Sequence, residues 1–266
     1  MRTENIRATI EYPEFIMQKI QLLCLPYAGG SSAIYHKWEA YLDPRIRLVP
    51  VELAGRGRRI GEAFYRDRAA AVDDIFSQIK EVIGRLPYAL FGHSLGAMLA
   101  YELSQKIMDM GLDQPAHCFF SGKSAPHLCR EKKLFHLMGE EEFKKEILEL
   151  GGTPPELFDS PELLSIFLPL LKADFRLVET ELPDGRIRPL KEDITVFLGK
   201  DDDFTALQCD GWKKHTSRLC SIHYFEGGHF FLHDHLERLV RIVNNTLQVP
   251  ELPSGPTNYH ATSYTH

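Results

Sequence analysis

The chain has 266 residues, of which 44% are hydrophobic and 26% charged, and it carries a formal net charge of −6. These values are ordinary for a soluble globular protein, so they exclude disorder of the whole chain, and the negative charge argues against a binder of bulk nucleic acid. No apolar run reaches the about 18 residues of a membrane-spanning helix, and the polar start predicts no secretory signal. The five cysteines include no CxxC pair, which favours buried thiols in a reducing compartment and therefore a cytoplasmic enzyme.

Short apolar runs alternate with helical patterns along most of the chain. The expected strands cover residues 22–25, 47–52, 88–91, 118–121, 194–198 and 222–225. The expected helices cover residues 68–83, 97–108 and 236–247. Strands that alternate with helices of this length predict an α/β fold with a parallel, doubly wound sheet. We expect one domain over residues 1–249, followed by a polar, proline-containing segment over 250–266 that predicts a flexible tail.

One long segment, about residues 123–190, shows no clear strand pattern. It contains helical patterns over 140–150, 161–171 and 174–182, divided by Pro154-Pro155 and by Pro169. An all-helical insertion between two strands predicts a lid over the carboxyl edge of the sheet, which is where open α/β sheets bind their ligands.

The sequence GHSLG, residues 92–96, matches G-x-S-x-G and lies between an expected strand and an expected helix. This is the context of a nucleophile elbow, in which a sharp turn exposes a serine hydroxyl. The glycines allow strand and helix to approach closely, and the N–H groups at the helix N-terminus favour negative charge. We therefore expect Ser94 to be a catalytic nucleophile and the Leu95 N–H to be an oxyanion donor. The alternative is a strand-to-helix turn without chemistry.

A serine hydroxyl needs a base at neutral pH, and in elbow hydrolases the acid and then the histidine follow the serine along the chain. His229 follows an expected strand and the glycines Gly227 and Gly228, which places an imidazole on a loop at the carboxyl edge of the sheet. His223 lies inside an expected strand and His233 near a helix start. We therefore expect His229 to be the catalytic base.

Three adjacent aspartates follow the expected strand over residues 194–198 and supply the candidate acid. An acid beside the histidine fixes the imidazole tautomer and stabilises the imidazolium. The G-x-x-D spacing from Gly199 favours Asp202, and Asp201 is the alternative. At most one aspartate can face the histidine, so the others are expected to be solvated or to cap the turn.

The second oxyanion donor is expected in the loop after the first strand, PYAGG at residues 26–30. Gly29 and Gly30 leave room for the backbone to approach a substrate carbonyl. We expect the Ala28 N–H to be the donor, with that of Tyr27 next. An ordinary glycine turn is the alternative.

His229 and His233 are four residues apart, a spacing that is also found at zinc sites. The residue after the first histidine is Phe230, not the glutamate of H-E-x-x-H, and no third ligand is evident. We expect neither a metal nor any other cofactor.

Six short motifs occur in one order along the chain. They are PYAGG (26–30), LAGR (53–56), GHSLG (92–96), LGGTP (150–154), GKDD (199–202) and GGH (227–229). In this the chain resembles the type II thioesterases that accompany non-ribosomal peptide and polyketide synthetases, and it is similar to the medium-chain fatty-acyl thioesterase of animals. The resemblance extends from about residue 20 to 247. It implies an α/β-hydrolase fold with a helical lid, and hydrolysis of wrongly loaded or stalled acyl groups from the phosphopantetheine arm of acyl or peptidyl carrier proteins.

Two positions depart from the pattern of that family. Ala54 stands where the family usually has a proline before Gly-Arg, and Tyr27 stands where phenylalanine or tryptophan is common. We expect Ala54 to change local loop geometry only, and Tyr27 to reshape the acyl entrance without changing the mechanism.

Two segments are expected to contact the substrate or its carrier. Apolar lid residues would partly line the acyl site, with simple helix packing as the alternative for each: Leu163, Phe167, Leu170, Leu171 and Phe175. Residues 55–68 contain five arginines against two acids, a local net charge of +3. We expect Arg56, Arg58 and Arg59 to contact an acidic carrier protein or the pantetheine phosphate. A solvated loop is the alternative.

Three other functions stay open on sequence grounds. A small-molecule carboxylesterase or lipase would use the same triad, because oxyesters and thioesters share its chemistry. A non-catalytic binding module is disfavoured by the order of Ser94, the aspartates and His229. A medium-chain fatty-acyl thioesterase differs in partner and acyl length, which sequence does not resolve because one methylene changes pocket preference by only about 1–3 kcal/mol. We expect a monomer without nucleic-acid or membrane partners.

Overall fold

The computed structural model describes residues 20–128, 133–153, 156–179 and 187–247. Its centre is a sheet of six parallel strands: β1 (Ile20–Leu25), β2 (Ile46–Pro50), β3 (Tyr88–His93), β4 (His117–Ser121), β5 (Ile194–Gly199) and β6 (Cys220–Phe225). The strands lie in the order β2-β1-β3-β4-β5-β6, so the chain changes direction across the sheet between β1 and β3. The expected parallel sheet is confirmed, and the crevice beyond the carboxyl ends of β1 and β3 is the topological switch point at which such sheets bind ligands.

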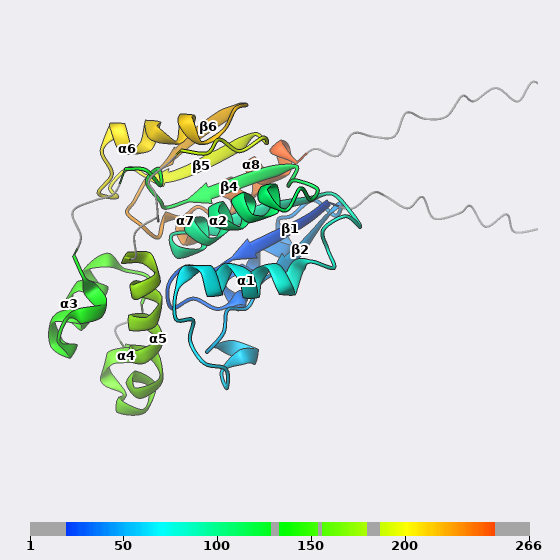
Figure 1. Ribbon diagram of the computed structural model, residues 1–266. Coiled ribbons are helices and arrows are strands. Elements are labelled where there is room, and N and C mark those ends of the chain that lie inside the picture. The colour runs from blue at the N-terminus through cyan, green and yellow to red at the C-terminus, as the bar shows by residue number, and fades with distance from the viewer. Residues whose placement is uncertain (1–19, 129–132, 154–155, 180–186, 248–266) are drawn as a thin grey trace, which may run out of the picture.

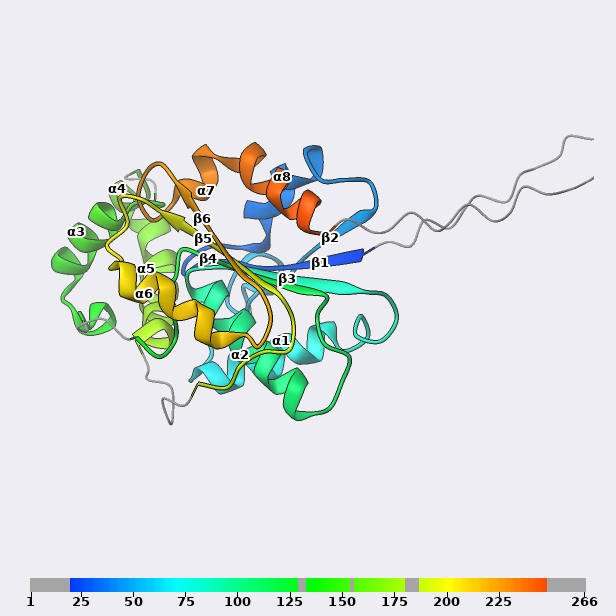
Figure 2. The same cartoon turned by 90° about the horizontal axis from the view of Figure 1, so that it is seen from above.

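Helices cover both faces of the sheet (Figures 1 and 2). One face carries α1 (Arg68–Ile79), α2 (Leu95–Asp109), α6 (Ala206–Asp210) and the 3-10 helix η4 (Gly211–His215). The other carries the 3-10 helix η1 (Ser32–Ala40), α7 (Phe231–Asp234) and α8 (Leu236–Thr246). A short 3-10 turn, η2 (Gly57–Arg59), lies in the loop between β2 and α1. The sheet is therefore doubly wound, as expected.

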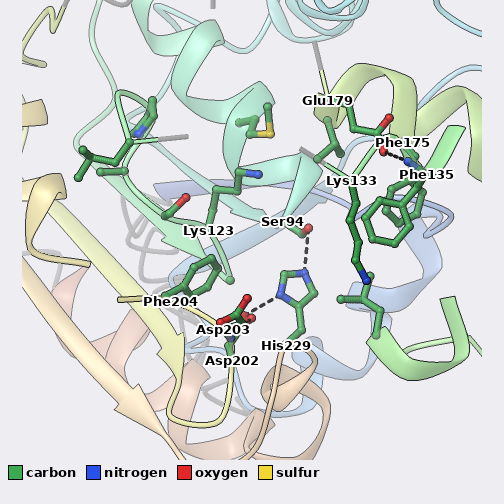
Figure 3. A pocket seen from close by; sticks show the side chains of 18 of the residues that line it. Ser94, Lys123, Lys133, Phe135, Phe175, Glu179, Asp202, Asp203, Phe204 and His229 are labelled. Atoms are coloured by element: carbon green, nitrogen blue, oxygen red, sulfur yellow. Dashed lines mark hydrogen bonds and ion pairs between the residues drawn. The ribbon is translucent and has the colours of Figure 1, made fainter. Parts of the chain in front are cut away.

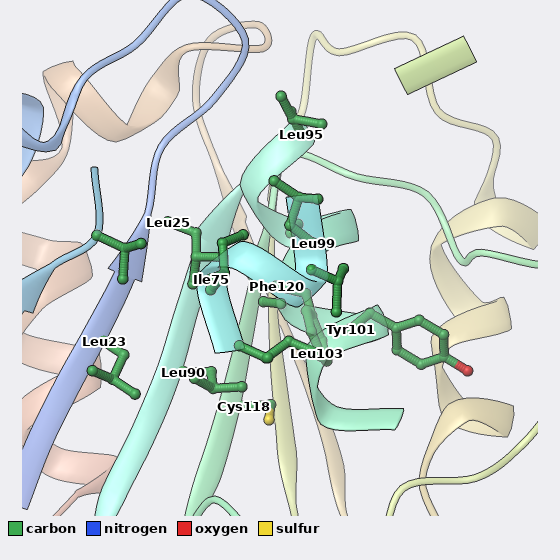
Figure 4. Packing of buried hydrophobic residues seen from close by; sticks show 14 of the residues in the cluster. Leu23, Leu25, Ile75, Leu90, Leu95, Leu99, Tyr101, Leu103, Cys118 and Phe120 are labelled. Atoms are coloured by element: carbon green, nitrogen blue, oxygen red, sulfur yellow. The ribbon is translucent and has the colours of Figure 1, made fainter. Parts of the chain in front are cut away.

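The strands supply both layers of the core because successive side chains point to opposite faces. In β1, Leu23 packs on the face of α1 and α2, whereas Leu22 packs on the face of η1 and α8. Figure 4 shows Leu99 of α2 and Ile75 of α1 in the same cluster as Leu90 of β3. The strands β1, β3, β4 and β5 are thus buried on both faces, whereas the edge strands β2 and β6 are partly exposed. The functional loops follow the carboxyl ends of these strands.

The segment between β4 and β5 carries the 3-10 helix η3 (Phe135–Leu137), α3 (Glu140–Leu150), α4 (Glu156–Asp159) and α5 (Pro161–Glu179). These helices lie beyond the carboxyl ends of the strands (Figure 1), where a lid was expected. The expected break at Pro169 is wrong, because α5 runs through it. The proline removes one helical hydrogen bond, but Leu170, Leu171 and Phe175 are buried, and this packing outweighs the local preference.

Three expectations lie outside the described residues: the break at Pro154-Pro155, the end of a helix at 182 and the tail over 250–266. Of the helices that the structure does describe, none is sufficiently long and apolar to cross a membrane.

Candidate active site

Ser94 occupies the sharp turn between β3 and α2. Its φ is 53° and its ψ is −111°, and among the described residues it is the one non-glycine residue with a positive φ. The Ser94 N–H donates to the Ser121 carbonyl at 2.8 Å, which ties the turn to the end of β4. Backbone strain of this kind costs about 1–3 kcal/mol and persists where the surrounding structure enforces it, which is common at functional sites.

Gly92 and Gly96 allow the strand, the turn and the helix to approach each other. A Cβ on Gly92 would lie 2.1 Å from the Gly96 carbonyl oxygen, and a Cβ on Gly96 would lie 2.1 Å from the Leu25 carbonyl oxygen. Both obstacles are backbone atoms, which cannot swing away. The two glycines of G-x-S-x-G are therefore steric requirements of this turn.

The strain at Ser94 predicts a difference in stability between two variants that lack the hydroxyl. Ser94→Ala keeps a Cβ at a positive φ, whereas Ser94→Gly removes the steric penalty at some cost in unfolded-state entropy. We expect the free energy of unfolding to be about 1 kcal/mol higher for the glycine variant. Urea denaturation measures this difference, and a less stable glycine variant would show that the turn stores no strain.

His229 and Asp202 lie on the loops after β6 and β5, next to Ser94 (Figure 3). His229 Nδ1 lies 2.7 Å from Asp202 Oδ2, and His229 Nε2 lies 2.9 Å from Ser94 Oγ. Because a carboxylate can only accept, Nδ1 carries a proton and donates it, which leaves Nε2 to accept from the serine hydroxyl. The exposed fractions of the His229 and Asp202 side chains are 12% and 6%. Water therefore competes little for these hydrogen bonds.

Gly199 lets the two loops meet. A Cβ there would lie 2.3 Å from the Gly228 carbonyl oxygen. The Asp201 N–H donates to the Gly227 carbonyl at 3.0 Å, while the Asp201 side chain is exposed. The backbone thus turns the next residue, Asp202, toward the histidine. Of the two candidate acids, the structure places Asp202 and not Asp201 against the imidazole.

The neighbouring histidines have other partners. His93 is fully buried, its Nδ1 lies 2.9 Å from Ser121 Oγ, and burial holds its pKa well below the ordinary value, so it is neutral. His233 Nε2 lies 3.1 Å from the Tyr27 hydroxyl, while both ring nitrogens of His229 are already engaged. The side chains of His229 and His233 therefore do not converge on a common point. Within the described ranges no group of three His, Cys, Asp or Glu side chains is arranged to hold a metal ion.

The backbone N–H groups of Leu95 and Ala28 are the candidate donors of an oxyanion hole. Leu95 is the first residue of α2, and the N–H groups of a first helical turn have no acceptor within the helix. In the loop after β1, the Gly29 N–H donates to Asp174 and the Gly30 N–H donates to the Tyr27 carbonyl. Over the described residues, the N–H of Ala28, which precedes these two glycines, donates to no protein group.

A cavity of about 600 Å³ lies between the sheet edge and the lid helices, with Ser94 and His229 in its wall (Figure 3). Its apolar lining includes Met98, Leu128, Phe135, Leu150, Phe175 and Phe204. Charged side chains line it as well, among them Lys123, Lys133, Glu149 and Glu179. The site therefore combines a nucleophile, a base and an amphipathic cavity of the size that ligand pockets have.

The lid contributes to this cavity differently than expected. Of the five lid residues expected to line it, Phe175 does so. Leu163 is 45% exposed and Phe167 is half-buried, and neither lines the cavity, whereas Leu170 and Leu171 are packed in the core. Helix packing, the alternative reading of the apolar stripe, thus accounts for the last two.

A family model described as thioesterase domain matches residues 20–247. The chain belongs to the thioesterase domain family. LgrE of Brevibacillus parabrevis, named linear gramicidin dehydrogenase, is 36% identical over 86% of this chain and 88% of its own length. The crystal structure of ClbQ from the colibactin NRPS/PKS pathway shares 39% identity and a TM-score of 0.81, covering 86% of this chain and 96% of ClbQ. YbtT, a type II thioesterase from the yersiniabactin NRPS/PKS biosynthetic pathway, shares 29% identity and a TM-score of 0.76, covering 88% and 95%. These likenesses confirm the expected family and its α/β-hydrolase fold.

Of the three arginines expected to contact a carrier protein, the thioesterase exposes one. Arg56 is 4% exposed and forms a bidentate pair with Asp174, so the expectation is wrong for Arg56, because its charge is matched inside the protein. Arg59 is 16% exposed and forms a bidentate pair with Asp74 at 2.7 and 2.9 Å. Arg58 is exposed, and its contact with a carrier stays a prediction.

Sequence reasoning missed Asp174, the partner of Arg56. It lies on the buried side of α5 with Leu171 and Phe175. An acid within an apolar helical stripe is a signal of a buried cationic partner, because charged side chains are seldom buried unpaired. This pattern could have predicted that Asp174 is buried and paired, but only the fold shows that its partner is Arg56.

Proposed function

We propose that this thioesterase hydrolyses acyl groups from the phosphopantetheine arm of carrier proteins and so removes aberrant or stalled units from a peptide or polyketide synthetase. The observation that carries the chemistry is the hydrogen-bonded chain from Ser94 through His229 to Asp202 in the wall of a cavity. ClbQ and YbtT come from NRPS/PKS pathways, which supports the carrier-bound substrate. The thiols of Cys24 and Cys118 are buried and free, which suits action in the cytoplasm.

In the proposed acylation step, Ser94 Oγ attacks the thioester carbonyl carbon and His229 Nε2 takes the hydroxyl proton. The carbonyl oxygen becomes an oxyanion, which accepts from the N–H groups of Leu95 and Ala28. The carbon–sulfur bond then breaks. The leaving thiol has a pKa of about 8.5, so the imidazolium easily returns a proton to the sulfur. Asp202 stabilises the imidazolium of His229 both when it takes the serine proton and when it gives a proton to the sulfur.

In the proposed deacylation step, a water molecule replaces the thiol. His229 takes a proton from this water, which attacks the acyl-serine carbonyl, and the same two N–H groups accept the second oxyanion. Collapse breaks the ester bond and returns the proton to Ser94 Oγ. The products are a carboxylic acid and a carrier with a free thiol.

Acyl transfer is favoured over the hydride transfer that the name of LgrE suggests for that protein. The serine–histidine–aspartate chain supplies a nucleophile and a base, which acyl transfer needs and hydride transfer does not. A medium-chain fatty-acyl thioesterase or a small-molecule carboxylesterase would use the same three residues. These two functions are therefore distinguished by substrate and not by the site.

We expect carrier-bound acyl groups to be the preferred substrates. The test compares acetyl- and longer acyl-phosphopantetheinyl carrier protein with the matching acyl-CoA and p-nitrophenyl esters, with Ser94→Ala as control. Acyl-CoA contains the same pantetheine arm, so the difference isolates contacts with the carrier protein. We expect kcat/KM to be at least about tenfold higher for the carrier-bound group, which corresponds to about 1.4 kcal/mol.

Two outcomes of this comparison would contradict the proposal. Turnover of p-nitrophenyl esters with carrier-bound groups untouched would assign the protein to the general esterases. Equal kcat/KM for acyl-CoA and acyl carrier protein, highest at medium chain length, would favour a fatty-acyl thioesterase.

A further inference from the structure

Three separate segments meet at one buried ion pair beneath the lid. Arg56, in the loop after β2, donates from both terminal nitrogens to the carboxylate oxygens of Asp174 on α5, at 2.6 and 2.7 Å. The exposed fractions of these side chains are 4% and 2%. Both also bind the loop after β1, because Asp174 accepts from the Gly29 N–H at 2.7 Å and Arg56 donates to the Gly30 carbonyl at 3.1 Å.

This loop carries the Ala28 N–H, the proposed second oxyanion donor. The peptide that follows Ala28 is held through the Gly29 N–H. The peptide that contains the Ala28 N–H is held because its Tyr27 carbonyl accepts from the Gly30 N–H at 2.9 Å. Gly29 has a φ of +79° and no Cβ, so its own covalent structure restrains the turn little. The ion pair thus holds the Gly29 N–H and the Gly30 carbonyl, and the hydrogen bond from Gly30 to Tyr27 passes this restraint on to the Ala28 N–H.

We propose that Arg56 and Asp174 are positioning residues that hold the Ala28 N–H where an oxyanion hole requires it. The proposal rests on the proposed function, because it assumes a tetrahedral oxyanion beside Ser94. A backbone donor accelerates the reaction only when it already points at the position where charge develops. A carboxylate is suited to fixing the neighbouring N–H, since hydrogen bonds to charged acceptors are shorter and stronger than neutral ones.

The same contacts fix one half of the lid helix to the oxyanion loop. Leu171, one turn before Asp174, packs so closely on Gly29 that a Cβ there would lie 2.5 Å from Leu171 Cδ2. The buried residues of α5 all follow Pro169, whereas Leu163 before it is 45% exposed. Within α5, the part that follows Pro169 is therefore the part held against the oxyanion loop.

Two variants separate a positioning role from a merely structural one. Asp174→Asn keeps the side-chain volume but leaves the buried Arg56 charge uncompensated, so it lowers stability as well as kcat. The double variant Arg56→Met/Asp174→Leu removes both charges, and apolar replacement of a buried ion pair often restores stability. Asp74→Asn is the matched control, because Asp74 forms a similar bidentate pair with Arg59. Its other hydrogen bonds go to Tyr65 and Gln78 and none reaches residues 26–31 in the described part of the chain.

Three quantities are measured for each variant: the melting temperature, kcat and KM on an acyl-pantetheine thioester, and inhibition by a trifluoromethyl ketone. The ketone forms a tetrahedral adduct with Ser94 and therefore reports the oxyanion hole. We expect kcat to fall about 10- to 100-fold in both Asp174 variants, with KM changed less than about threefold. The inhibition constant of the ketone should rise by a similar factor. In the double variant the melting temperature should recover while kcat and ketone affinity stay low.

Recovery of kcat together with the melting temperature in the double variant would overturn the proposal, because the pair would then act on stability alone. A loss of kcat in Asp174→Asn no larger than in Asp74→Asn would also overturn it. If Asp174→Asn does not fold, the kcat and ketone affinity of the double variant test the positioning role. Ser94→Ala is measured beside them: an active Ser94→Ala contradicts the proposed function, whereas an inactive one beside fully active Asp174 variants contradicts the positioning role alone.

Discussion

Ser94→Ala is expected to abolish thioester hydrolysis while leaving the fold intact. The proposed acyl-enzyme forms on Ser94 Oγ, which lies 2.9 Å from His229 Nε2 at the only positive-φ non-glycine residue of the described chain. Removal of the nucleophile in comparable triads lowers kcat by about 10⁴- to 10⁶-fold. The measurement is release of free carrier thiol over time, with the variant and the wild type at equal concentration.

The control for Ser94→Ala is its circular dichroism and melting temperature, which should match the wild type to within a few degrees. A fluorophosphonate should label the wild type and leave the variant unlabelled, since labelling requires an activated serine. Hydrolysis by the folded variant at more than about a hundredth of the wild-type rate would contradict the proposed nucleophile.

Asp202→Asn is expected to lower kcat by about 10³- to 10⁴-fold, whereas Asp201→Asn should change it less than about threefold. The Asp202 carboxylate accepts from His229 Nδ1 at 2.7 Å, and an amide there permits the wrong imidazole tautomer. Asp201 is an adjacent residue of the same type whose side chain is exposed, so the two variants form a matched pair. Steady-state kinetics on one acyl carrier protein measures both.

A structural explanation of the Asp202 effect is tested by the melting temperature. Both asparagine variants should unfold within a few degrees of the wild type, because the substitution keeps the shape of the side chain. Equal losses of kcat at the two positions, or the larger loss in Asp201→Asn, would show that the acid had been assigned to the wrong residue.

The sheet and its switch point follow from local patterns in the sequence. Runs such as 22–25 and 118–121 are apolar on both faces, which is how a doubly covered parallel strand differs from an edge strand. The need for glycine at positions 92 and 96 can likewise be predicted, because the close approach that Gly92 and Gly96 permit is a local property of the turn. Ser94 and His229 are found for the same reason, since each follows a strand that ends at the functional edge.

Features that depend on the direction of a side chain are harder to predict from sequence. Asp201 and Asp202 differ by one position, and a backbone hydrogen bond from Asp201 to Gly227 decides which faces the histidine. The sequence pattern around Arg56 is that of a surface cation, because its partner Asp174 lies 118 residues further along the chain. The path of α5 through Pro169 is not predicted from sequence either, because tertiary packing there overrides the tendency of proline to break a helix.

The most direct measurement of the central claim is the mass of the intact protein during a single turnover with an acyl carrier protein. Acylation expels a thiol with a pKa of about 8.5, whereas deacylation must expel the more basic serine oxygen, so the acyl-enzyme should accumulate after an acid quench. We expect a mass increase of one acyl group, located on the peptide that contains Ser94 and absent from Ser94→Ala. Deacylation of the carrier without any adduct on Ser94, at every quench time, would contradict the proposed mechanism.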